Sequence, residues 1–102
     1  MKFVVTWTTR TGASVADNEA AVGRVLSVFS KWTPPADTTF HQFLGRLDGT
    51  GGFSVIETDN PDSVGEAAAK FNTYFHFEII PVNDIGETTR LLSEGVEFRK
   101  SV

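Results

Sequence analysis

The stretch TTFHQFLGRLDGTGGFSVIETD, residues 38–59, decides the fold because it contains two strands joined by a turn. β-Branched and aromatic residues recur along residues 38–47 and 53–59, and such residues favour strands. The linker between the two strands, DGTGG at residues 48–52, is short and rich in glycine. A linker of this kind predicts an antiparallel hairpin.

Strands and helices alternate on both sides of this hairpin. Before it, Lys2–Thr9 predicts a strand, and Ser14 caps an amphipathic helix that stops at Pro34-Pro35. After it, Asn60 caps a second helix with Pro61 in the first turn. The remaining predicted elements are a strand at 76–82, a short helix from Asp84 to about Glu94 that Gly95 stops, and a tail or edge strand at 96–102.

This order of elements predicts an α+β fold. Strand, helix, strand, strand, helix, strand is the βαββαβ order of a ferredoxin-like domain, here with an extra C-terminal helix. We therefore predict a single domain over residues 1–102 with a four-stranded antiparallel sheet. Right-handed crossovers place both long helices on one face of that sheet and leave the other face open.

The open face is predicted to carry apolar side chains among polar ones. Strand alternation assigns it Val4, Leu44, Ile56, Ile80 and Val82. A second copy of the chain, related by a two-fold axis, would cover this patch, so we predict a homodimer. The alternative is a mildly apolar sheet face that stays exposed to water.

Composition excludes several classes of protein. The chain has 40% hydrophobic residues, no cysteine and a net charge of −4. Scattered basic residues and an acidic balance argue against nucleic-acid binding. The absence of cysteine excludes disulfides and thiolate chemistry. The N-terminal residues lack the apolar run of a signal peptide, and no stretch has the length of a membrane span, so we expect a cytoplasmic protein without membrane contacts.

Several segments resemble a known group of proteins. They are Met1–Thr9, Trp32–Pro35, Phe40–Phe43, Gly51–Asp59 and the helix start Asn60-Pro61. With the order of elements, they resemble the dimeric α/β-barrel superfamily, and within it a small bacterial family catalogued only as a domain of unknown function. The resemblance implies a dimeric barrel. Relatives in the superfamily include cofactor-independent monooxygenases, isomerases, cyclases and stress proteins, so it implies no single activity.

His41 and Glu57 are the candidate catalytic residues. If Leu47 faces Phe53 across a five-residue turn, one set of side chains points to the helix-covered face, namely His41, Phe43, Leu47, Phe53, Val55 and Glu57. A histidine and a carboxylate in an apolar space form an acid–base couple. The alternative is a structural or solvated pair, and a four-residue turn would reverse the alternation and separate the two side chains.

Aromatic residues are the second candidate for a site. The chain contains nine Phe, two Trp and one Tyr. We predict that Trp7, Trp32, Phe43 and Tyr74 line a ligand pocket between the first helix and the sheet. The alternative is that the rings fill an ordinary core, which we expect for most of the phenylalanines.

No cofactor and no metal site are predicted, because His41 and His76 are expected on opposite faces of the sheet. A purely structural role as a stress-induced dimer, with a solid core in place of a cavity, is one alternative, and two functions remain beside it. One is a cofactor-independent isomerase, cyclase or monooxygenase that acts on a hydrophobic aromatic or polyketide-like substrate. The other is a non-catalytic homodimeric module, of the stress-responsive type, that binds a ligand or partner. The enzyme requires a cavity with His41 and Glu57 on its wall, whereas the binding module requires the cavity alone.

Overall fold

The computed structural model describes residues 1–12 and 14–102. It contains four strands and three helices within those residues. In chain order they are β1 (Lys2–Thr9), α1 (Val15–Lys31), β2 (Thr39–Gly45), β3 (Gly51–Glu57), α2 (Pro61–Phe71), β4 (Phe75–Val82) and α3 (Ile85–Lys100). The predicted α+β class is confirmed.

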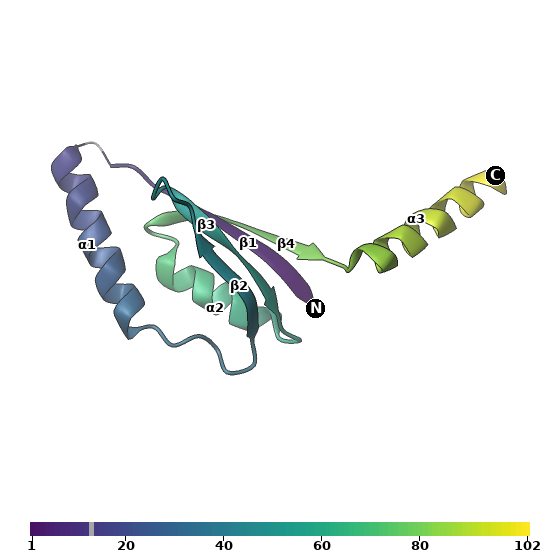
Figure 1. Cartoon of the computed structure of the whole chain (residues 1–102), viewed down its shortest axis with the longest axis horizontal. Coiled ribbons are helices and arrows are strands. Elements are labelled where there is room, and N and C mark those ends of the chain that lie inside the picture. The colour runs from purple at the N-terminus through teal and green to yellow at the C-terminus, as the bar shows by residue number, and fades with distance from the viewer. Residues whose placement is uncertain (13) are drawn as a thin grey trace.

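The strands form one open antiparallel sheet in the order β2-β3-β1-β4. Figure 1 shows α2 lying along one face of the sheet, α1 beside it, and α3 projecting past the end of β4. A small core joins α2 to the sheet through Val64, Phe3, Val5 and Ile56. The face that α2 covers is called the covered face below, and the opposite face the open face.

The helix starts are as predicted from the sequence. The Asp17 backbone N–H donates to Ser14 Oγ at 3.0 Å, and the Asp62 N–H donates to Asn60 Oδ1 at 3.2 Å. The N–H groups in the first turn of a helix have no carbonyl partner within that helix, and each of these side-chain bonds satisfies one of them.

The turn between β2 and β3 differs from the prediction and changes the register. The Arg46 N–H donates to Gly51 O at 2.8 Å, so four residues, 47–50, form the turn. Asp48 organises this turn by accepting hydrogen bonds from the Arg46 side chain and from Thr50. The Arg46 bond first, and the Thr50 bonds next, hold the pKa of Asp48 far below its ordinary value. Gly49 has a φ of 74°, which glycine adopts without strain.

The new register exchanges the two faces of β3. Phe43 stands opposite Ser54 instead of Glu57, and Leu44 stands opposite Phe53. Ile56, predicted on the open face, is only 4% exposed in the core. By alternation, the predicted covered residues Phe53 and Val55 lie on the open face instead. Leu47, also predicted to be covered, is exposed in the turn.

A β-bulge in β2 accompanies this register. Phe40 pairs with Ile56 and Gln42 with Val55, so His41 is an extra residue without a partner position. Strict alternation would send Phe40 and Phe43 to opposite faces, since they are three residues apart. The bulge turns both rings toward the covered face.

The third helix is longer than predicted. It continues through Gly95 to Lys100, and the predicted tail or edge strand at 96–102 is wrong. Glycine inside a helix costs about 1 kcal/mol relative to alanine. Ion pairs spaced for a helix, Arg90–Glu94 and Glu97–Lys100, lie on both sides of Gly95 and favour continuation. Among the described residues, no helix combines the length and apolar character needed to cross a membrane.

Candidate functional site

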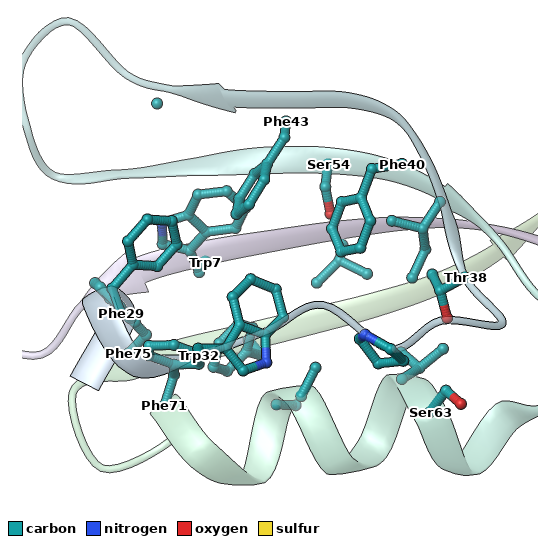
Figure 2. A pocket seen from close by; sticks show the side chains of 18 of the residues that line it. Trp7, Phe29, Trp32, Thr38, Phe40, Phe43, Ser54, Ser63, Phe71 and Phe75 are labelled. Carbon is teal, nitrogen blue, oxygen red and sulfur yellow. The ribbon is translucent and has the colours of Figure 1, made fainter.

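A cavity of about 390 Å³ lies between α1, α2 and the covered face of the sheet. Its wall is almost entirely apolar, and Figure 2 shows rings from both helices and from the strands pointing into it. The aromatic lining residues are Trp7, Phe29, Trp32, Phe40, Phe43, Phe71, Phe75 and Phe77. The volume is within the range of small-molecule sites in proteins, which begins at about 300 Å³.

The rings contact one another mostly edge to face. Trp32 packs against Phe71 with ring centroids 5.6 Å apart and an interplanar angle of 89°, and against Phe43 at 6.3 Å and 85°. Trp7 packs against Phe43 at 5.6 Å and 79°. Because the ring edge is positive and its face negative, such contacts hold the rings in fixed orientations. The wall therefore presents ordered faces on which a planar molecule can stack.

Few polar groups reach the wall, and two of them, the Thr38 and Ser63 hydroxyl groups, already donate to Asp37. Thr38, Ser54 and Ser63 contribute hydroxyl groups. The Ser63 hydroxyl donates to Asp37, with Oγ–Oδ1 at 2.7 Å, and Asn60 also donates to Asp37 at 3.1 Å. These bonds, that of Ser63 first, lower the pKa of Asp37 below its ordinary value. They tie the segment before β2 to the start of α2.

Trp32 carries a polar group without a partner. Its indole Nε1 is buried, and no described residue accepts a hydrogen bond from it. An unpaired buried donor costs about 1–3 kcal/mol. Such a group is unusual in a well-satisfied core and is more common where a protein meets a ligand.

The structure brings together three of the four predicted pocket residues. Trp7, Trp32 and Phe43 line the cavity, whereas Tyr74 does not. Tyr74 lies in the turn between α2 and β4, where its backbone carbonyl accepts from the Arg10 N–H at 2.8 Å. The wall also contains five phenylalanines that were expected mainly as core. The richness in Phe was the signal for them, but the sequence does not show which rings surround an empty space.

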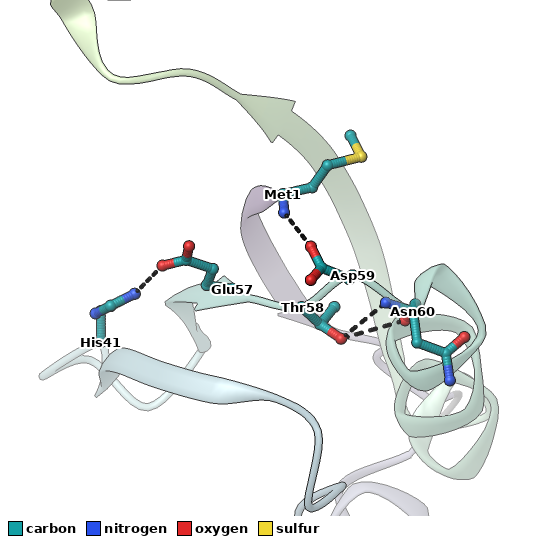
Figure 3. Close-up of polar contacts among 6 residues, drawn as sticks. All are labelled: Met1, His41, Glu57, Thr58, Asp59 and Asn60. Carbon is teal, nitrogen blue, oxygen red and sulfur yellow. Dashed lines mark hydrogen bonds and ion pairs between the residues drawn. The ribbon is translucent and has the colours of Figure 1, made fainter.

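The predicted catalytic residues meet, but not at the cavity. His41 Nε2 lies 2.8 Å from Glu57 Oε1, as Figure 3 shows. Their side chains are 43% and 48% exposed, and neither lines the cavity. Glu57 follows Ile56 in β3 and therefore lies on the open face. The prediction that the pair enters the covered apolar space is wrong, because the four-residue turn places Glu57, and the bulge in β2 places His41, on the open face.

Two further charges surround this pair. Lys2 stands opposite Glu57 in the sheet, and its Nζ lies 2.7 Å from Asp84 Oδ1. The hydrogen bond to Asp84 is the main cause that raises the pKa of Lys2, and the Glu57 charge adds to it. The pKa of Asp84 is lowered, chiefly by Lys2 and further by His41. The sequence did not indicate this alternating cluster of charges, because Lys2 and Asp84 are far apart in the chain.

No group of three or more His, Cys, Asp or Glu side chains with metal-binding geometry occurs among residues 1–12 and 14–102. The prediction that His41 and His76 lie on opposite faces is wrong, because His76 stands opposite Thr8 and therefore lies on the open face as well.

Fold and site together define a small α+β protein with an open antiparallel sheet and an aromatic cavity under its helices. Residues 1–96 match the family described as "Domain of unknown function (DUF3303)", and the chain belongs to that family. The resemblance to a family of unknown function is thus confirmed. No curated protein matches the sequence.

Proposed function

We propose that this protein binds a small, planar, hydrophobic molecule in the aromatic cavity. The observation that carries the proposal is the wall itself, in which eight rings and a few hydroxyl groups surround about 390 Å³. An aromatic or polyketide-like ring system stacks on such a wall, and one of its oxygen atoms is matched by the Ser54 hydroxyl group. The buried Trp32 Nε1, which lacks an acceptor in the described residues, favours a ligand with an acceptor atom.

The geometry favours binding over proton transfer. The enzyme hypothesis places His41 and Glu57 within reach of the ligand, because a general base must approach the proton that it removes. Both side chains lie on the open face and outside the cavity wall. The cavity lining contains no Asp, Glu, His, Lys or Arg. A non-catalytic binding protein is therefore our first proposal, and an isomerase, cyclase or monooxygenase is the second.

We also propose that the domain is ferredoxin-like and forms a dimeric α/β barrel. The strand order β2-β3-β1-β4 supports the first part. The open face supports the second, since Leu44, Phe53 and Ile80 are 46%, 37% and 43% exposed there. A second copy of the chain on this face would bury these side chains symmetrically.

The binding proposal is tested by intrinsic fluorescence, because both tryptophans of the chain line the cavity. Titration with 2-naphthol is expected to change the emission of Trp7 and Trp32 in a saturable way. Ala67→Phe places a ring inside the cavity and is expected to weaken binding about tenfold or more, by loss of the stacking space.

Ala69→Phe is the matched control, because Ala69 lies on the same helix but is exposed and outside the cavity wall. It is expected to bind as the wild type does. Equal binding by both variants, or no saturable binding by the wild type, would contradict the proposal.

A further inference from the structure

Helix α3 has one charged face that is internally paired and one apolar face that is exposed. On the charged face, Arg90 pairs with Glu87 and Glu94, and Lys100 pairs with Glu97. The other face carries apolar side chains at the spacing of a helix, namely Ile85, Leu91, Leu92, Val96 and Phe98. Ile85, Leu92 and Phe98 are 79%, 66% and 70% exposed. An apolar stripe of this size predicts a covering surface.

That covering surface is not provided by the described part of the same chain. Figure 1 shows α3 directed away from the sheet and from the other helices, with the C-terminal end farthest out. The radius of gyration is 17.8 Å. A compact domain of this length would have a radius of about 13 Å. Most of the stability of a helix in a protein comes from the packing of its apolar face, so the exposed apolar face of α3 lacks its main stabilising contacts.

The start of α3 is fixed beside the open face of the sheet. Asp84, the residue before the helix, forms its ion pair with Lys2 of β1. Lys2 stands opposite Val82 and Glu57 and points to the same face as Val4. The apolar face of α3 and the apolar part of the open face are therefore neighbouring surfaces of one chain, and both are uncovered.

We propose that α3 is an arm that packs against a second copy of this chain. The proposal rests on the dimer proposed above and adds α3 to its interface. With a rise of about 1.5 Å per residue, α3 extends about 24 Å beyond the sheet, far enough to lie along a neighbouring domain. A two-fold pair buries both uncovered surfaces at once and repeats each contact on both subunits.

The charges of α3 favour a second copy over other occupants. Its three acidic residues, Glu87, Glu94 and Glu97, balance its three basic residues, Arg90, Arg99 and Lys100. A helix that docks on nucleic acid or on an anionic membrane carries an excess of positive charge. The paired charges lie on the side away from Leu92 and Val96, and Arg99 lies on the apolar side. A helix without net charge that exposes an apolar face is typical of a protein–protein interface.

The first test is sedimentation equilibrium of the full-length chain. The wild type is expected at twice the 11.2 kDa chain mass. Leu92→Glu, on the apolar face, is expected to raise the dimer dissociation constant about tenfold or more. Ser93→Glu adds the same charge one residue further along and is expected to leave it unchanged. Saturable 2-naphthol binding by both variants shows that the domain has folded.

The second test uses the absence of cysteine from the chain. A single thiol introduced by Val96→Cys is expected to react slowly with a charged thiol reagent at high protein concentration and rapidly after dilution. Ser93→Cys is the exposed control and is expected to react rapidly at every concentration. Protection that depends on concentration identifies a second copy as the covering surface.

Three outcomes would overturn the proposal that α3 packs against a second copy. Protection of the thiol at every concentration would mean that α3 folds back on its own chain. An unchanged dimer in Leu92→Glu would remove α3 from the interface and leave the dimer of the open face in place. A wild type that stays at the mass of one chain would remove both the arm and the dimer, without affecting the proposed ligand site.

Discussion

The two faces of the sheet are built from the same four strands and differ in what they offer. The covered face carries the core of Phe3, Val5 and Ile56 and, next to it, a cavity walled by rings. The open face carries exposed apolar side chains together with two polar pairs, Lys2 with Asp84 and His41 with Glu57. The difference teaches that an odd shift in the pairing of β2 with β3, here of three residues, decides which side chains lie beside the cavity.

The largest difference between the two faces is expected in the free energy of unfolding of variants at Ile56 and Val55, which are neighbours in β3. Ile56→Ala is expected to lower the free energy of unfolding by about 2–5 kcal/mol, because it leaves a cavity in the core. Val55→Ala, on the open face, is expected to cost about 1 kcal/mol or less. Denaturant unfolding at a protein concentration low enough to keep the chain monomeric measures both. The reverse ranking would mean that the register described here is wrong.

A second effect is expected at the pair Gly52 and Gly45, which stand opposite each other in β3 and β2. A Cβ at Gly52 would lie 2.2 Å from Leu44 O and 2.5 Å from Trp7 Cζ2, whereas a Cβ at Gly45 would meet nothing within 4 Å. Gly52→Ala is expected to destabilise the fold by about 1–3 kcal/mol through overpacking. Thermal unfolding compares the two variants, and equal melting temperatures would contradict the close approach of Trp7 and β3.

Asp37 supplies a smaller, pH-dependent effect on the covered side. Its pKa in the folded state lies below the ordinary value of 3.8, chiefly because Ser63 donates a hydrogen bond to it. The stability that this bond contributes is therefore present above the ordinary value and is lost as the pH falls through the folded-state pKa. At neutral pH the wild type is expected to unfold at a higher denaturant concentration than Asp37→Asn. The difference between the two unfolding midpoints is expected to become smaller in acid. If the difference between the two midpoints is the same at every pH, the ionised carboxylate of Asp37 is not the cause of the difference in stability.

The smallest effect is expected at His41. Because the His41–Glu57 pair is exposed to solvent, His41→Ala is expected to change the free energy of unfolding by about 1 kcal/mol or less. The affinity for 2-naphthol is expected to stay unchanged, since His41 does not line the cavity. A marked loss of affinity would return His41 to the ligand site and favour the catalytic hypothesis.

The sequence predicts the elements of this fold better than their register. Ser14 and Asn60 act locally, by accepting bonds from backbone N–H groups two or three residues away, and Pro61 acts through its fixed backbone angle, so their roles follow from spacing. The turn between β2 and β3 depends on side-chain bonds from Asp48 to Arg46 and Thr50. Those bonds shorten the turn to four residues, and no periodic pattern reveals them.

The meeting of His41 and Glu57 shows how two missed features can offset each other. The shorter turn alone would place the two side chains on opposite faces. The bulge at His41 shifts the alternation of β2 a second time, and the imidazole reaches Glu57 across the open face. The pairing was predictable from hairpin proximity, but the face was not. Helix α3 was missed beyond Glu94 because Gly95 indicates a helix end from local sequence, whereas the structure continues the helix through it to Lys100.

The central claim is that the covered face, and not the open face, is where this protein holds a ligand. Methyl-labelled protein with bound 2-naphthol tests it most directly, by nuclear Overhauser contacts between ligand protons and the methyl groups of β1, β3 and α2. The account predicts contacts to Val5, Ile56 and Val64, which line the cavity. Contacts to Val4, Val55 and Ile80 instead would place the ligand on the open face and contradict it.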